Sequence, residues 1–306
     1  MSLPRRHAAL HGTLRLLLAA LAIATSAAAS AGQTCAATPP DTASVTHALA
    51  LADSVRRSLD ASGAQVVLLA RAGQDLSKYG LRYSHLGFAY REPAPADPSQ
   101  ANEGRQPPPA ATAVQEAPTS PPTPAPRTPG PGTWRIAHKL NACGTADAAI
   151  YRQGLAEFFL DTPYRYEAAY VVLQPAAQAT LLPLLRDDRR LVQWHTPAYS
   201  MVAYPWATTY QQSNQWAIET LAGALDPAAS TRARAQAWLQ LHDYRPTVLH
   251  LDAFTRLGAR MTKDNVAFDD HPNAKRFSDH IETVSVDSVF DWLQRVELAS
   301  APVEIR

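Results

Sequence analysis

Apolar and polar residues follow two different spacings in the first half of the chain, and each spacing predicts a type of element. Residues 44–60 carry apolar side chains at helical spacing, which predicts an amphipathic helix. The stretches 64–73 and 84–92 are rich in β-branched and aromatic residues, and each predicts a strand. A third strand is predicted at 133–140, where the sequence reads TWRIAHKL.

The second half continues with helical and strand patterns in alternation. The predicted elements are, in order, a helix at 145–161, a strand at 166–174, a helix at 175–187 that Pro183 interrupts, a strand at 199–206, helices at 213–225 and 230–241, extended segments at 246–252 and 281–286, and a helix at 287–296. Helices and strands mixed in this order predict an α+β fold.

A proline-rich stretch at 92–132 separates the second and third predicted strands. It holds 13 of the 25 prolines, mixed with Ala, Thr, Ser and Gln. Such a composition buries too little apolar surface to offset the entropy of ordering, so we expect a disordered insertion. A linker between two domains is the alternative. We favour an insertion between two strands of one sheet, since a strand pattern resumes directly after it.

The first 31 residues predict a cleavable signal peptide. Arg5, Arg6 and Arg15 precede the run LLLAALAIA, which is too short to span a bilayer, and small residues up to Ala31 form a cleavage site. An N-terminus retained in the membrane is the alternative. Residues 32–306 are then expected to form one periplasmic or secreted α+β domain without a transmembrane segment, with 226–306 as its C-terminal extension.

Charge and cysteine content narrow the function classes. The formal net charge of +1, without a basic run, argues against a nucleic-acid partner. The two cysteines, Cys35 and Cys143, predict one disulfide in an oxidising compartment. The alternative is a reactive thiol at Cys143.

His85 is the first candidate for chemistry. It lies on the predicted strand in the sequence YSHLGFAY, and Gly87 on the same face leaves room for a substrate or for a close backbone. A structural role is the plain alternative for a histidine on a strand. The stretch from Val66 to Tyr90 resembles the start of the circularly permuted papain-like hydrolases, which are relatives of the cell-wall amidases and of lecithin retinol acyltransferase.

That resemblance implies an antiparallel papain-like sheet with packed helices and a role for particular residues. His85 takes the place of the catalytic histidine, and His138 takes that of the third polar residue. The family's cysteine, at a helix N-terminus, falls on Ser213, with Trp216 as the apolar residue one turn later. The amides of Gln212 and Asn214, with backbone N–H groups, are the candidates for holding an oxyanion.

Serine in place of cysteine changes the chemistry that the helix terminus supports. A helix N-terminus stabilises an anion by up to about 2 kcal/mol, which is enough to help a thiol but not a hydroxyl. Ser213 therefore needs a general base, which the resemblance assigns to His85, oriented by His138. The alternative is that Ser213 caps the helix.

Two functions stay open on these grounds. One is a hydrolase or acyltransferase acting on amide or ester bonds of the cell envelope, with peptidoglycan, a peptide or a lipid as substrate and with no cofactor. The other is a periplasmic binding protein that keeps the cleft without catalysis. The polar segment FDDHPNAKRFSDH offers carboxylate and imidazole ligands for a metal ion, namely Asp269, Asp270, His271, Asp279 and His280. Their spacing fits no standard site, and a solvated loop is the favoured interpretation.

The chain as a whole resembles a proteobacterial family of exported proteins known as domain of unknown function 2145. The stretches LNACGT, YRQGL, YQQSNQW and DDHP carry this resemblance. It covers nearly all of the chain after the signal peptide and implies no particular activity.

Overall fold

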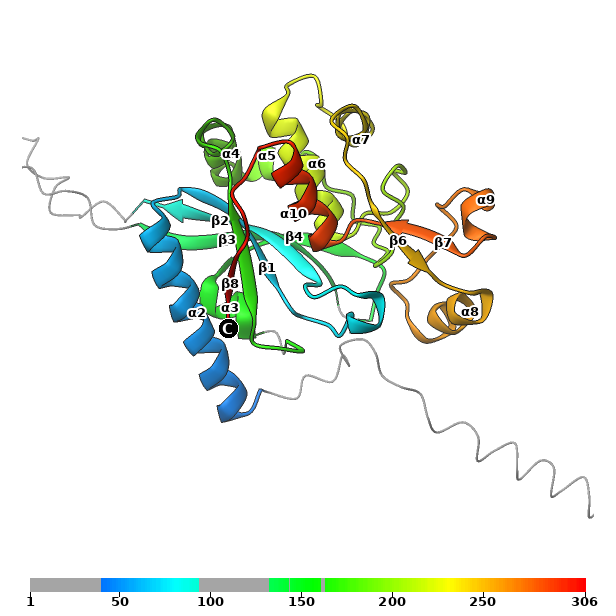
Figure 1. Cartoon of the computed structure of the whole chain (residues 1–306), viewed down its shortest axis with the longest axis horizontal. Helices are drawn as coiled ribbons and strands as arrows, with labels where there is room; N and C mark the ends of the chain where they lie inside the picture. Colours follow the sequence, from blue (N-terminus) through cyan, green and yellow to red (C-terminus); the bar gives the residue numbers. More distant parts are fainter. Residues whose placement is uncertain (1–39, 94–131, 143, 161–162) are drawn as a thin grey trace, which may run out of the picture.

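The computed structural model describes residues 40–93, 132–142, 144–160 and 163–306, and a six-stranded antiparallel sheet lies at its centre (Figure 1). Its strands lie in the order β4-β3-β2-β1-β5-β8, and β6 and β7 pair in a separate two-stranded sheet. The strands are β1 (Val66–Arg71), β2 (His85–Glu92), β3 (Thr133–Asn141), β4 (Ala148–Gly154), β5 (Ala168–Val172), β6 (Thr247–His250), β7 (His280–Thr283) and β8 (Val303–Ile305).

Helices cover both faces of the large sheet (Figure 1). The helices of the described residues are α2 (Thr42–Ser62), the 3-10 turn η1 (Ser77–Tyr79), α3 (Leu155–Leu160), α4 (Pro175–Arg186), α5 (Asp188–Leu191), α6 (Ser213–Leu225), α7 (Arg232–Leu241), α8 (Ala253–Thr262), α9 (Asn273–Arg276) and α10 (Val286–Arg295). This mixture of an antiparallel sheet and helices confirms the α+β prediction.

Alternate residues of β1 divide the core into two layers. Val67 and Leu69 pack with α2 and α3, whereas Val66 and Leu68 pack with α4, α6 and α10. Because helices lie over both faces, every residue of β1 is buried. Burial on both faces also explains the continuous apolar run that predicted this strand.

Strands β2 and β3 are neighbours on either side of the proline-rich stretch. Glu92 lies opposite Thr133 in the register, so the intervening chain connects two adjacent strands of the large sheet. Residues 94–131 lie outside the described residues, as do the predicted signal peptide at 1–31 and both Cys35 and Cys143. Within the described ranges, no helix is both long enough and apolar enough to cross a membrane.

Three of the element predictions differ from the structure. The predicted helix at 145–161 is strand β4 followed by the short helix α3. Residues 148–154 pair over their whole length with residues 135–141 of β3 and form an edge strand, and this pairing overrides a pattern that also fits a helix. The predicted strand at 199–206 is a series of turns. Helix α4 continues through Pro183 without a break.

Candidate functional site

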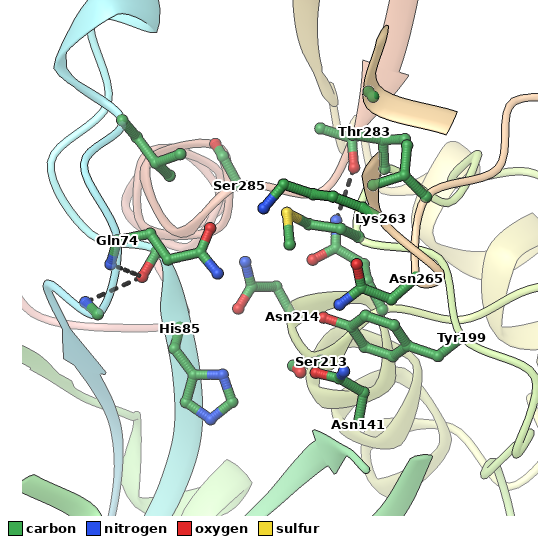
Figure 2. Close-up of a pocket in the computed structure, with 18 of the residues that line it drawn as sticks. Gln74, His85, Asn141, Tyr199, Ser213, Asn214, Lys263, Asn265, Thr283 and Ser285 are labelled. Carbon is green, nitrogen blue, oxygen red and sulfur yellow. Dashed lines mark hydrogen bonds between the residues drawn. The ribbon is translucent and has the colours of Figure 1, made fainter. Parts of the chain in front are cut away.

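A cavity of about 590 Å³ lies between the N-terminus of α6, the loop after β1 and the segment from β6 to β7. Figure 2 shows polar side chains from all three regions turned toward it, with His85 and Ser213 at one end. The lining includes Gln74, His85, Asn141, Tyr199, Ser213, Asn214, Lys263, Asn265, Thr283 and Ser285. The structure therefore brings two of the predicted catalytic residues, His85 and Ser213, and both predicted oxyanion residues, Gln212 and Asn214, to one cavity.

Helix α6 carries three of the predicted site residues and is enclosed by the protein. Its first ten residues, Ser213 to Ala222, are all buried. Trp216 is fully buried and packs edge-on against Phe88 of β2, with ring centroids 5.9 Å apart. This contact fixes the start of the helix against the strand that carries His85, and it makes Trp216 a core residue.

Two side-chain amides tie the start of α6 to the end of β7. Nε2 of Gln212 donates to the hydroxyl of Thr283 at 2.6 Å and to the carbonyl of Val284 at 2.9 Å. Nδ2 of Asn214 donates to the same Val284 carbonyl at 3.1 Å. The other amide atom of Asn214, Oδ1, is buried and has no hydrogen-bond partner. Gln212 is thus a structural tie, whereas Asn214 keeps an acceptor for a further group.

Ser213 is the first residue of α6, and Gln212 is the N-cap. The Ser213 hydroxyl donates to the backbone carbonyl of Lys139 in β3 at 2.7 Å, so it does not act as the cap that the residue type suggested. Among the described residues, no hydrogen bond joins Ser213 to His85. The side chain of Gln212 does not cap the helix either, and the first turn contains no acidic residue, so its N–H groups keep their partial positive charge.

His85 and His138 form a buried pair on neighbouring strands. Nε2 of His85 lies 2.8 Å from Nδ1 of His138, and Nε2 of His138 lies 2.8 Å from Oε1 of Gln153 on β4. Gly87 makes this arrangement possible, because a Cβ at that position would lie 3.0 Å from Cβ of His138 and 2.9 Å from Cγ2 of Ile136. The space beside Gly87 is therefore filled by the neighbouring strand.

With Oε1 of Gln153 as the acceptor, these contacts favour one tautomer for each histidine. An amide oxygen only accepts hydrogen bonds, so Nε2 of His138 carries the proton that it shares with Gln153. In a neutral imidazole the other nitrogen is then an acceptor, so Nδ1 of His138 accepts from Nε2–H of His85. Nδ1 of His85, which has no hydrogen bond to another described residue, is left with its lone pair available.

The surroundings of His85 keep it neutral. Burial, and then the positive charge of Arg71, hold the pKa of His85 well below its ordinary value of 6.5. The Arg71 guanidinium is itself buried, donates to the carbonyl of Phe158 and lies 4.8 Å from the centre of that ring. A neutral histidine with a free lone pair at the edge of a cavity is able to accept a proton.

Lys139 is a buried cation that the sequence pattern did not reveal. Its ammonium donates to the Thr196 carbonyl at 2.6 Å and to Oε1 of Gln211 at 2.9 Å. Burial, reinforced by Arg232 and opposed by Glu219, lowers the pKa of Lys139 to about 7. The feature of the sequence that could have indicated this buried lysine is its position inside an apolar strand. The hydrogen-bond partners of Lys139 lie 57 and 72 residues away in the sequence.

The acidic segment near residue 270 is tied into the fold. Asp270 accepts from the backbone N–H of Tyr204 at 2.7 Å and lies 2.9 Å from Nδ1 of His271. Nε2 of His271 lies 2.9 Å from the Glu282 carbonyl, and Asp269 accepts from Tyr210 at 3.3 Å. In the part of the chain that the structure describes, no three His, Cys, Asp or Glu side chains are arranged to hold a metal ion.

Comparison with known proteins identifies one family. The profile of a family described as "uncharacterized protein conserved in bacteria (DUF2145)" matches residues 58–293, which include the cavity and both histidines. No curated protein and no solved structure matches the chain. Since the matched region covers well over half of the sequence, the chain belongs to this bacterial family.

Proposed function

We propose that this protein is a hydrolase or acyltransferase acting on amide or ester bonds, with His85 as its general base. The observation that carries the proposal is the chain of contacts from Gln153 through His138 to His85, which leaves the lone pair of His85 Nδ1 available at the cavity. A base held by a second polar group is the arrangement that activates a weak nucleophile in acyl transfer.

Ser213 is the nucleophile in this proposal. For attack, its hydroxyl leaves the Lys139 carbonyl and turns toward His85. Nδ1 of His85 takes the proton while the Ser213 oxygen bonds to the acyl carbon, and the carbonyl oxygen becomes an oxyanion beside the N–H groups of the first turn of α6. The His85 imidazolium then protonates the leaving amine or alcohol. Water, or an acceptor alcohol or amine, resolves the acyl-enzyme by the same path in reverse.

The resemblance to the permuted papain-like hydrolases supports the same roles. In those hydrolases, the strand with the histidine precedes the strand with the third polar residue, and the helix with the nucleophile comes last. Strands β2 and β3 and helix α6 follow the same order in this chain. With an exported, periplasmic or secreted location, the substrates to test first are peptidoglycan fragments, peptides and lipid esters.

A serine-reactive fluorophosphonate probe tests the proposal directly. We expect the probe to label the purified protein at Ser213, and the variants Ser213→Ala and His85→Gln to lose the label. Thr255→Ala is the matched control, because it removes another hydroxyl from the cavity lining and should leave labelling unchanged. Labelling that persists in Ser213→Ala would show that another residue is the nucleophile.

The second candidate is a binding protein without catalysis, and the hydrogen bond from Ser213 to the Lys139 carbonyl favours it. In that case the unpartnered Oδ1 of Asn214 and the uncapped N-terminus of α6 present an acceptor and donors side by side, which matches an amide group of a ligand. Absence of labelling, together with binding of peptidoglycan fragments that Asn214→Leu abolishes, would favour this alternative.

A further inference from the structure

Helix α8 presents its apolar side chains to solvent, which reverses the usual orientation of a surface helix. Phe254, Leu257 and Met261 are 88%, 57% and 78% exposed, and their spacing places them along one face of the helix. We call this face, with Arg260 beside it, the outer face of α8. In a helix that packs only against its own protein, these residues would point into the core.

The opposite side of α8 explains why the helix is turned this way. Thr255, Ala259 and Thr262 line the cavity, together with Lys263 directly after the helix. Arg256 is buried, donates to the carbonyl of Leu251 and pairs with Asp279 at 2.5 Å. Arg256 is thus held inward, and the large apolar residues are left outside.

The charged residues around the outer face of α8 favour contact with an anionic surface. Arg260 is exposed in the last turn of α8, whereas Lys263, directly after the helix, lines the cavity. Nearby carboxylates are already engaged: Asp252 caps the helix by accepting from the Thr255 N–H at 2.7 Å, and Asp279 pairs with Arg256. Asp264 lines the cavity.

A second exposed aromatic residue lies at the same end of the molecule. Phe277, directly after α9, is 71% exposed, and the Arg276 guanidinium lies 4.8 Å from the centre of its ring. Figure 1 shows α8 and α9 together at the edge of the molecule, away from the large sheet. Exposed aromatic and aliphatic side chains with arginine beside them are typical of helices that lie in a lipid headgroup layer.

We propose that the outer face of α8 docks on an anionic lipid bilayer, with Phe254, Leu257 and Met261 inserted among the acyl chains and Arg260 at the headgroups. The proposal is independent of whether the cavity catalyses a reaction. It places the cavity directly behind the docked helix.

Co-sedimentation of the purified full chain with vesicles tests the proposal. We expect binding to vesicles containing phosphatidylglycerol, weaker binding to pure phosphatidylcholine, and a decrease as the salt concentration rises. The double variant Leu257→Gln with Met261→Gln should weaken binding at least about tenfold. Arg260→Glu should weaken binding to the anionic vesicles by about fivefold or more and should change binding to neutral vesicles little.

Leu241→Gln is the matched control, because Leu241 is 84% exposed at the end of α7 and lies outside the outer face of α8. Circular dichroism checks that each variant is folded. Lack of vesicle binding by the unaltered protein, or equal binding by the double variant, would overturn the proposal. A dimer in size-exclusion chromatography that the double variant converts to a monomer would overturn it as well, because the face would then bind a second copy of the chain.

Discussion

Nε2 of His85 lies 2.8 Å from Nδ1 of His138, so a single hydrogen bond joins these two histidines on adjacent strands. Protonating both rings would place an N–H of each toward the other and add a second positive charge in a buried site. The pair is therefore stable only with at least one neutral ring. The cavity-facing nitrogen of His85 depends on this condition.

Replacing His138 by phenylalanine tests the contribution of this contact. The ring volume is largely kept, but Nε2–H of His85 loses its buried acceptor, which costs about 1–3 kcal/mol of the free energy of unfolding. Urea unfolding at neutral pH measures the change. If His85 is a general base, the variant should also hydrolyse or transfer acyl groups with a lower kcat and a nearly unchanged KM, because the orientation of the base is lost. An unchanged unfolding free energy would show that the contact is not formed in solution.

The low pKa of His85 predicts a loss of stability in acid. The unfolded chain binds a proton at His85 below about pH 6.5, whereas the folded chain does not, so the free energy of unfolding falls as the pH drops below 6.5. His195, whose pKa burial lowers to about 4, adds to the same slope. Unfolding at several pH values between 7.5 and 4.5 measures it, and His85→Gln should make the decline shallower. Equal slopes in the two proteins would contradict the assignment.

The lowered pKa of Lys139 predicts how the free energy of unfolding changes above pH 7. Between its folded pKa of about 7 and its unfolded value of 10.5, the unfolded chain binds a proton that the folded chain has lost. The free energy of unfolding should therefore rise with pH in this window, by at most about 1.4 kcal/mol per pH unit from this group. Below pH 7 the lysine is charged in both states, and its burial cost is fully present. Lys139→Met should remove the rise, and a variant that keeps it would contradict the buried lysine.

Gly87 and Gly258 form a matched pair for substitution by alanine. At Gly87 a Cβ meets atoms of Ile136 and His138 at 3.0 Å or less, and overpacking of this kind costs about 1–3 kcal/mol. At Gly258 a Cβ meets nothing within 4 Å, and alanine in a helix is favoured by up to about 1 kcal/mol. Thermal unfolding should therefore show a lower Tm for Gly87→Ala and an equal or higher Tm for Gly258→Ala. The reverse order would be incompatible with the β2–β3 contact.

The pair of Glu219 and Arg232 is the most enclosed pair of an arginine and a carboxylate in the described ranges. Nε of Arg232 lies 2.7 Å from the fully buried Glu219 carboxylate, which also accepts from Gln211 and Gln236. Glu219→Gln leaves Arg232 charged and buried, so we expect a loss of about 3–5 kcal/mol in urea unfolding.

The exposed pair of Asp243 and Arg245 provides the control for this measurement. Both side chains are more than half exposed, so Asp243→Asn should cost less than about 1 kcal/mol. Similar losses in the two variants would argue against burial of the first pair.

The sequence pattern predicted those elements whose periodicity comes from burial. The strand at 66–71 and the helix at 213–225 were recognisable because their apolar positions face a core. The segment 148–154 was assigned to a helix because its side chains alternate only weakly, and nothing local reveals that β3 pairs along it.

The candidate site shows the same limit. Residue type and order along the chain predicted that Ser213 and His85 lie close together, and both line one cavity. The acceptor of the Ser213 hydroxyl, however, is 74 residues away in the sequence. A preference for serine at helix N-caps therefore pointed to the wrong partner. The contact between His85 and His138 depends on the register of β2 against β3, across a gap of 53 residues, and could be anticipated only through the family resemblance.

Because α6 is enclosed over its first ten residues, its N-terminus belongs to the part of the protein that opens last. Amide hydrogens after the first turn of α6 should exchange only through global unfolding. A ligand at Ser213 and Asn214 would thus meet groups that are already in place and would lose little entropy in ordering them. The same enclosure limits the substitutions that this position tolerates, so a change in specificity is more readily achieved through the cavity walls contributed by α8 than through α6 itself.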